Sequence, residues 1–111
     1  MMLDLRLYMA QRLSALVMVP LVLGHIAVMI YAIQGGLTTA EILSRTQGSL
    51  GWALFYGLFV LAVSIHAAIG LRVIVFETFG LRGAGLGVLT WAVGLGLLYL
   101  GARAVLAVTL T

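Results

Sequence analysis

Residues 51–72 read GWALFYGLFVLAVSIHAAIGLR, an apolar stretch in which the first charged side chain is Arg72, at the very end. The stretch is as long as the roughly 20 residues that an α-helix needs to cross a hydrocarbon core of about 30 Å. His66 lies inside it. An ionisable or metal-binding side chain is costly in hydrocarbon, so its presence there marks a candidate functional site.

Apolar segments of similar length lie on both sides of this one, which predicts membrane spans near residues 13–33, 52–76 and 86–108. The composition agrees, because 64% of the residues are hydrophobic and only 8% are charged. A soluble domain carries about 25% charged residues. We therefore expect an all-α integral membrane protein with three transmembrane helices, forming a single membrane-anchor domain over residues 1–111.

The polar segment between the first two spans carries a helix start signal. Thr38 is followed three residues later by Glu41, the spacing of a capping box. This pattern predicts a short interfacial helix over about residues 39–46. Three spans enclose little interior of their own, whereas polar groups in membranes usually face the inside of a bundle. We therefore expect the chain to be part of a larger helical bundle with a partner subunit.

The third span contains neither histidine nor acid, but glycine recurs in it at seven-residue intervals, at Gly87, Gly94 and Gly101. Residues at this spacing fall on one stripe of a helix, where glycine lets another backbone approach closely. The stripe predicts a packing role for this span.

Positive charge is concentrated on one side of the predicted spans. Arg6 and Arg12 precede the first span, Arg72 and Arg82 flank the second loop, and the first loop carries Arg45. By the positive-inside rule the N-terminus and the second loop lie in the cytoplasm. The net charge of +3 includes no lysine and no arginine run, so it indicates topology and not a nucleic-acid partner. The chain has no cysteine, which excludes disulfides and thiolate-held iron–sulfur clusters within it.

The two histidines of the chain, His25 and His66, both fall in predicted spans. Along a helix, His25 is ~20 Å from Arg12, whereas His66 is ~9 Å from Arg72, so the two rings should differ in depth by ~10 Å. Two axial ligands of one haem iron need nitrogens only ~4 Å apart. Two readings stay open: two haems, each completed by a histidine of another chain, or one haem at His66 with His25 structural. A histidine that only bonds a neighbouring helix is the plainer alternative.

Two short motifs resemble a known family. HAAIGLR at residues 66–72 resembles the His-x-x-x-Gly-[Ile/Leu]-Arg motif of the cytochrome b membrane subunit of succinate dehydrogenase, respiratory complex II. QRLS at residues 11–14 resembles the family's His-Arg-x-Ser-Gly entry to its first helix. The resemblance covers roughly residues 8–77, and the first of these motifs is the more specific.

For haem, the resemblance implies that His66 is an axial ligand of haem b. His25 is similar to the first-helix histidines that ligate in the subset of the family with two haems, so one or two haems, shared with a partner chain, are implied. Arg12 is a candidate for contact with a haem propionate, and Arg72 is a further one, because an arginine fork suits a carboxylate.

For quinone, the resemblance implies a site at the cytoplasmic side. Arg12 and Ser14 match family positions near the ubiquinone pocket, and Tyr8 stands where the family often has serine. Gln11 replaces the histidine beside the arginine, and Ala15 replaces the glycine of the motif. Ubiquinone or menaquinone is therefore the expected substrate, with changed details of contact.

The resemblance thus implies a haem b-binding anchor of a succinate dehydrogenase or fumarate reductase in the bacterial inner membrane. It would pass electrons between an iron–sulfur subunit and membrane quinone, beside a flavoprotein subunit and a second small membrane anchor subunit. The chain would be a non-catalytic subunit, without catalytic residues of its own. The alternatives are a haem-free structural anchor of the same complex and a dihaem cytochrome b subunit of another membrane dehydrogenase.

Overall fold

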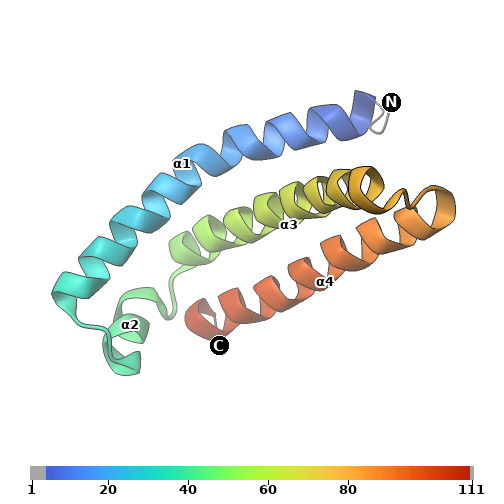
Figure 1. Ribbon diagram of the computed structural model, residues 1–111. Coiled ribbons are helices and arrows are strands. Elements are labelled where there is room, and N and C mark those ends of the chain that lie inside the picture. The colour runs from blue at the N-terminus through green and yellow to red at the C-terminus, as the bar shows by residue number, and fades with distance from the viewer. Residues whose placement is uncertain (1–4, 111) are drawn as a thin grey trace.

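The computed structural model describes residues 5–110, and the secondary structure of this part is helical throughout. Its helices are α1 (Leu5–Gly35), α2 (Thr39–Thr46), α3 (Leu50–Phe79) and α4 (Gly83–Thr109). The three long helices run side by side along a body of 48 × 24 × 22 Å, and α2 lies at the end away from the N-terminus (Figure 1).

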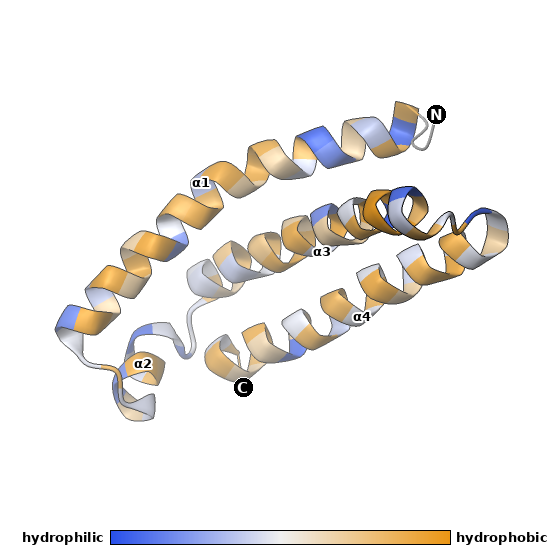
Figure 2. Ribbon diagram, viewed as in Figure 1, coloured by the Kyte–Doolittle hydropathy of each residue, from blue (hydrophilic) through white to orange (hydrophobic). Residues whose placement is uncertain are grey.

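Each long helix is apolar and long enough to cross a membrane, at 31, 30 and 27 residues for α1, α3 and α4. Apolar residues dominate all three along their length (Figure 2). The predicted spans lie inside these helices, so the three-span prediction is confirmed. At a rise of 1.5 Å per residue the helices are about 40–46 Å long, which exceeds the ~30 Å core. Their ends therefore extend into the headgroup region.

The short helix α2 begins where the capping box predicts. The Thr38 hydroxyl accepts from the backbone N–H of Glu41 at 3.2 Å and donates to the Glu41 carboxylate at 2.9 Å. The chain turns into this helix at Gly36, whose φ of 114° lies in a region that side chains other than glycine rarely adopt. Arg45 then donates to the Gly36 carbonyl at 2.8 Å, which ties the turn to α2.

The end of α2 and the segment after it cap the far end of α4. The Thr46 hydroxyl donates to the Val108 carbonyl at 2.7 Å, and the Gly48 backbone N–H donates to the Thr109 carbonyl. Carbonyls in the last turn of a helix lack donors within the helix itself. Thr46 and Thr109 are both buried, so these bonds satisfy groups that water reaches poorly.

Helix α3 is central and packs against α1 on one side and α4 on the other. The buried apolar residues of the described part are few, and two of the four are alanine: Ala62, Ala68, Ile69 and Leu86. Large apolar side chains lie outside, as Leu16 and Trp91 do at 70% exposure each. The chain therefore has little interior of its own, as predicted, and presents most of its apolar surface to lipid or to other subunits.

Glycine sets the close approach of α4 to α3 at two of the three predicted positions. A Cβ at Gly94 would lie 3.3 Å from that of Ala68, and one at Gly101 would overlap the side chain of Val60. A Cβ at Gly87 would meet open space. The glycine stripe thus packs within this chain along the second half of α4.

Candidate functional site

His66 lies on α3 and faces α1. Its Nδ1 is 3.4 Å from the hydroxyl oxygen of Ser14, a residue that is only 6% exposed. The same hydroxyl donates to the Gln11 carbonyl at 2.9 Å, one turn earlier in α1. The structure thus brings together Ser14 and His66, two predicted site residues that are far apart in the sequence.

This pair orients the imidazole and favours one of its two tautomers. A hydroxyl carries one proton, and that of Ser14 points to Gln11, so the oxygen is left as the acceptor for a proton on Nδ1 of His66. In neutral imidazole the other nitrogen, Nε2, then carries the lone pair. At 3.4 Å the contact is longer than an ordinary hydrogen bond, so its main effect is orientation of the ring.

Beside His66 an apolar groove of about 380 Å³ runs along α1. Its other lining residues are Ala15, Met18, Val19, Val22 and Leu23. These side chains bring no charge to the imidazole. The groove is therefore an apolar setting for the imidazole, whose nitrogen lone pair is the group that binds metals.

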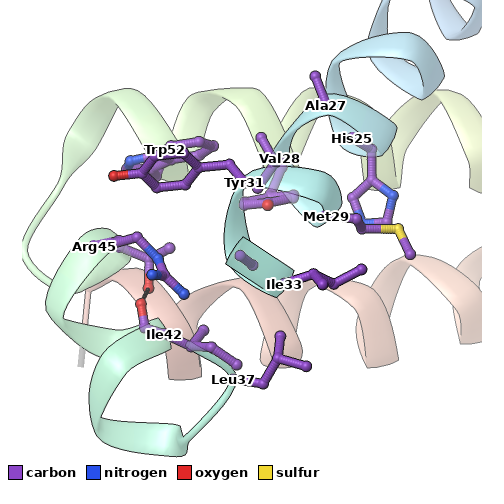
Figure 3. Close-up of a pocket in the computed structure, with 13 residues that line it drawn as sticks. His25, Ala27, Val28, Met29, Tyr31, Ile33, Leu37, Ile42, Arg45 and Trp52 are labelled. Atoms are coloured by element: carbon purple, nitrogen blue, oxygen red, sulfur yellow. Dashed lines mark hydrogen bonds between the residues drawn. The ribbon is translucent and has the colours of Figure 1, made fainter. Parts of the chain in front are cut away.

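His25 lines a different groove, of about 650 Å³, near α2. Figure 3 shows its ring at one end of this groove, with Trp52 and Arg45 toward the other. The ring stands edge-on to Phe59 at 5.4 Å and to Tyr56 at 6.1 Å between centroids. Aromatic packing thus holds His25, and within residues 5–110 no hydrogen bond fixes which of its nitrogens is protonated.

The two histidines lie at different depths. His66 is level with Ser14, whereas His25 is level with Tyr56 and Phe59. Counted along α1 from Ser14 to His25 the separation is ~16 Å, and along α3 from Phe59 to His66 it is ~10 Å. The route along α3 matches the ~10 Å expected from the sequence, and the route along α1 exceeds it. By either route one metal ion cannot bind both rings.

Arg12 and Tyr8 form a pair on the exposed face of α1. Arg12 Nη1 donates to the Tyr8 hydroxyl at 3.3 Å, and the guanidinium carbon lies 5.6 Å from the centre of the Tyr8 ring. Arg12 does not line the groove beside His66. Because residues two apart in a helix point in nearly opposite directions, Arg12 faces outward while Ser14 faces α3.

Arg72 is directed toward α4. Its Nη1 donates to the Thr90 hydroxyl at 3.2 Å, while its Nε is buried without an acceptor. It lines a groove between α1, α3 and α4 that His66 does not share. Six residues along a helix turn the side chain by about 240°, which is why the two ends of the HAAIGLR motif face different helices.

The sequence reasoning missed the residues that surround the predicted ones. Thr90 beside Arg72, and Tyr56 and Phe59 beside His25, belong to partner helices. Which residues of two apolar helices meet depends on the register of their packing, for which the sequence carries no signal. Within the described residues no group of three histidine, cysteine or acidic side chains could hold a metal ion. An iron atom at His66 would need its remaining ligands from a macrocycle and from another chain.

Comparison with known families extends the two short motifs to nearly the whole sequence. The model of the succinate dehydrogenase/fumarate reductase transmembrane subunit family matches residues 2–109. No curated protein and no solved structure matches the chain. Three apolar helices and a family match of this length agree on a multi-pass membrane subunit. The chain therefore belongs to the family of transmembrane subunits of succinate dehydrogenase and fumarate reductase.

Proposed function

We propose that this subunit binds one haem b through His66 and helps pass electrons between the iron–sulfur subunit and membrane quinone. The observation that carries the proposal is the contact between Ser14 and His66, which leaves Nε2 of the ring as a free nitrogen donor. Metal-bound histidines almost always donate their other N–H to a nearby acceptor, which fixes the ring. His66 has that arrangement with Ser14, and His25 lacks it.

The groove along α1 is suited to the flat, apolar body of a haem. Met18, Val22 and their neighbours would exclude water from the iron, which raises the influence of every nearby charge on the reduction potential. When bound, haem b supplies one-electron chemistry. The chain contributes the ligand, its orientation and the dry surroundings.

A second protein ligand to this haem would come from another chain, because His25 lies at a different depth from His66. A second small membrane anchor subunit is the natural source, packed on the apolar surface that this chain leaves exposed. The flavoprotein and the iron–sulfur subunit complete the complex at the membrane surface. We place the N-terminus in the cytoplasm of a bacterium, because arginine is concentrated at that end of the bundle.

Quinone, either ubiquinone or menaquinone, would bind near Arg12 and Tyr8. Both side chains are exposed at the N-terminal end of α1, and together they offer a guanidinium and a hydroxyl to a quinone carbonyl. Neither candidate for a haem propionate lines the groove beside His66, and Arg12 is the one whose side chain is exposed. Arg72 is engaged with Thr90 and lines a separate groove.

The proposal is tested on the purified, intact complex by optical difference spectroscopy and by the ratio of haem to flavin. The wild type should give a dithionite-reduced b-type band, and His66→Ala should lose it or shift it strongly while all subunits still co-purify. A wild-type complex without a b-type band would establish the haem-free anchor instead. An unchanged spectrum in His66→Ala would remove His66 as the ligand.

A further inference from the structure

A third groove, of about 600 Å³, lies where the N-terminal part of α1 meets α3 and α4. Its deepest residues are small, with Ser64 and Ala68 both nearly buried. Apolar side chains line its length, among them Leu61, Ile65 and Leu98. Neither His66 nor His25 lines it, so it is separate from the proposed haem site.

One end of this groove is cationic. Arg6 and Arg72 both line it, and neither Glu41 nor Glu77, the acids within residues 5–110, is among the lining residues. The Thr90 hydroxyl already donates to the Leu86 carbonyl at 2.8 Å, so it serves only as a neutral acceptor for Arg72. The Nε of Arg72 is buried, and it has no acceptor among residues 5–110.

Of the two guanidinium groups at this end of the groove, that of Arg72 is partly buried and that of Arg6 is exposed, and together they can bind an anion. Partly buried charge that lacks a counter-ion is costly, and an arginine fork binds phosphate oxygens well. From Arg72 the groove continues to the level of Leu61, which is ~16 Å further along α3 and toward the middle of the span. The groove therefore changes from cationic to apolar along its length, and this distance covers most of the length of one acyl chain.

We propose that this groove binds an anionic phospholipid, with its phosphate between Arg6 and Arg72 and one acyl chain along Leu61, Ile65 and Leu98. An anionic phospholipid supplies both a phosphate and an apolar chain, whereas an apolar partner helix without an acid at this level would fill the apolar part and leave Arg72 without an anion. Trp91, which lines the rim and is 70% exposed, suits the level of the lipid headgroups.

The proposal is tested on the delipidated, intact complex in neutral detergent, titrated with phosphatidylglycerol or with phosphatidylcholine of the same acyl chains. A lipid that binds only the folded complex raises its thermal midpoint. Phosphatidylglycerol should raise the midpoint at lower concentration than phosphatidylcholine. Equal titration by the two lipids in the wild type would overturn the proposal, and that result is also expected if a partner helix fills the groove.

Variants identify the binding residues. Arg6→Gln should shift the phosphatidylglycerol titration by about fivefold, the usual effect of one arginine near an anionic lipid. In the double variant Arg6→Gln with Arg72→Gln, phosphatidylglycerol should raise the thermal midpoint at the same concentration as phosphatidylcholine does. Arg82→Gln is the matched control, because Arg82 lies outside the groove and packs on Phe76, and it should titrate as the wild type does. An unshifted phosphatidylglycerol titration in Arg6→Gln alone, which changes only an exposed side chain, would also overturn the proposal. None of these outcomes depends on haem.

Discussion

Nδ1 of His66 on α3 lies 3.4 Å from the hydroxyl oxygen of Ser14 on α1, and that hydroxyl in turn donates to the Gln11 carbonyl. The first crossing of the membrane thereby orients an imidazole that belongs to the second. The serine at residue 14 stands in the family motif that the sequence associates with quinone, yet its contact in this fold is with the proposed haem ligand. The two motifs meet in space through this one pair.

Ser14→Ala should change the environment of the haem without removing it. The variant loses the acceptor for Nδ1–H, which lowers the electron density on the ring, so the haem midpoint potential should rise. Haem retention should weaken by about tenfold, as is usual when such a partner is lost. Redox titration of the b-type band measures the first effect. Ser14→Thr keeps a hydroxyl and should restore the wild-type potential, and an unchanged potential in Ser14→Ala would contradict the role.

His25→Phe should leave the haem-to-flavin ratio and the b-type spectrum unchanged. Phenylalanine retains an aromatic ring of similar size against Tyr56 and Phe59, so packing at this depth is preserved while the nitrogen donors are lost. The measurement is the difference spectrum of the purified complex together with its haem content. Loss of about half of the haem would instead establish a second haem at His25.

Arg12→Leu should lower quinone reduction by roughly tenfold or more, since a charged hydrogen bond contributes about 1.5–3 kcal/mol. Succinate oxidation with an artificial acceptor should stay near the wild-type rate, because that reaction bypasses the membrane. Comparison of the two rates on one preparation is the measurement. Tyr8→Phe removes the acceptor for Arg12 and should give a smaller loss of the same kind. Equal loss of both activities in Arg12→Leu would indicate a folding defect.

Gly101→Ala should destabilise the complex by about 1–3 kcal/mol, the typical cost of overpacking. The added methyl group overlaps Val60 and forces α4 away from α3. Gly87→Ala is the matched control, because a Cβ there meets nothing and alanine favours the helix. The measurement is the thermal midpoint of the purified complex. Val60→Ala combined with Gly101→Ala should recover part of the loss, and equal midpoints for both glycine variants would contradict the packing.

Much of this fold follows from composition and local chemistry. The long apolar runs around His25 and His66 predict helices because a bilayer leaves few other ways to satisfy a backbone. Thr38 and Glu41 predict the start of α2 because their capping bonds are local. The depth of the two histidines also follows, since the rise of a helix is fixed.

The contacts between helices could not be predicted from the sequence. Nothing in the sequence pairs Ser14 with His66, or Arg72 with Thr90, since many registers of apolar helices bury similar surfaces. The sequence also gave Gly87, Gly94 and Gly101 equal weight, although the first of them faces open space. The identity of a ligand at His66 depends on atoms outside this chain, so the binding of haem there is a proposal.

The caps that Thr46 and Gly48 place on the last carbonyls of α4 have a consequence for biogenesis. A third crossing inserted alone would bring those carbonyls to the membrane surface with only water as a donor. They gain donors from the protein only when the end of α2 and the segment after it, made some sixty residues earlier, are already folded. The helices are therefore expected to assemble in a fixed sequence, in which the first loop folds before the C-terminal end of α4 packs against it.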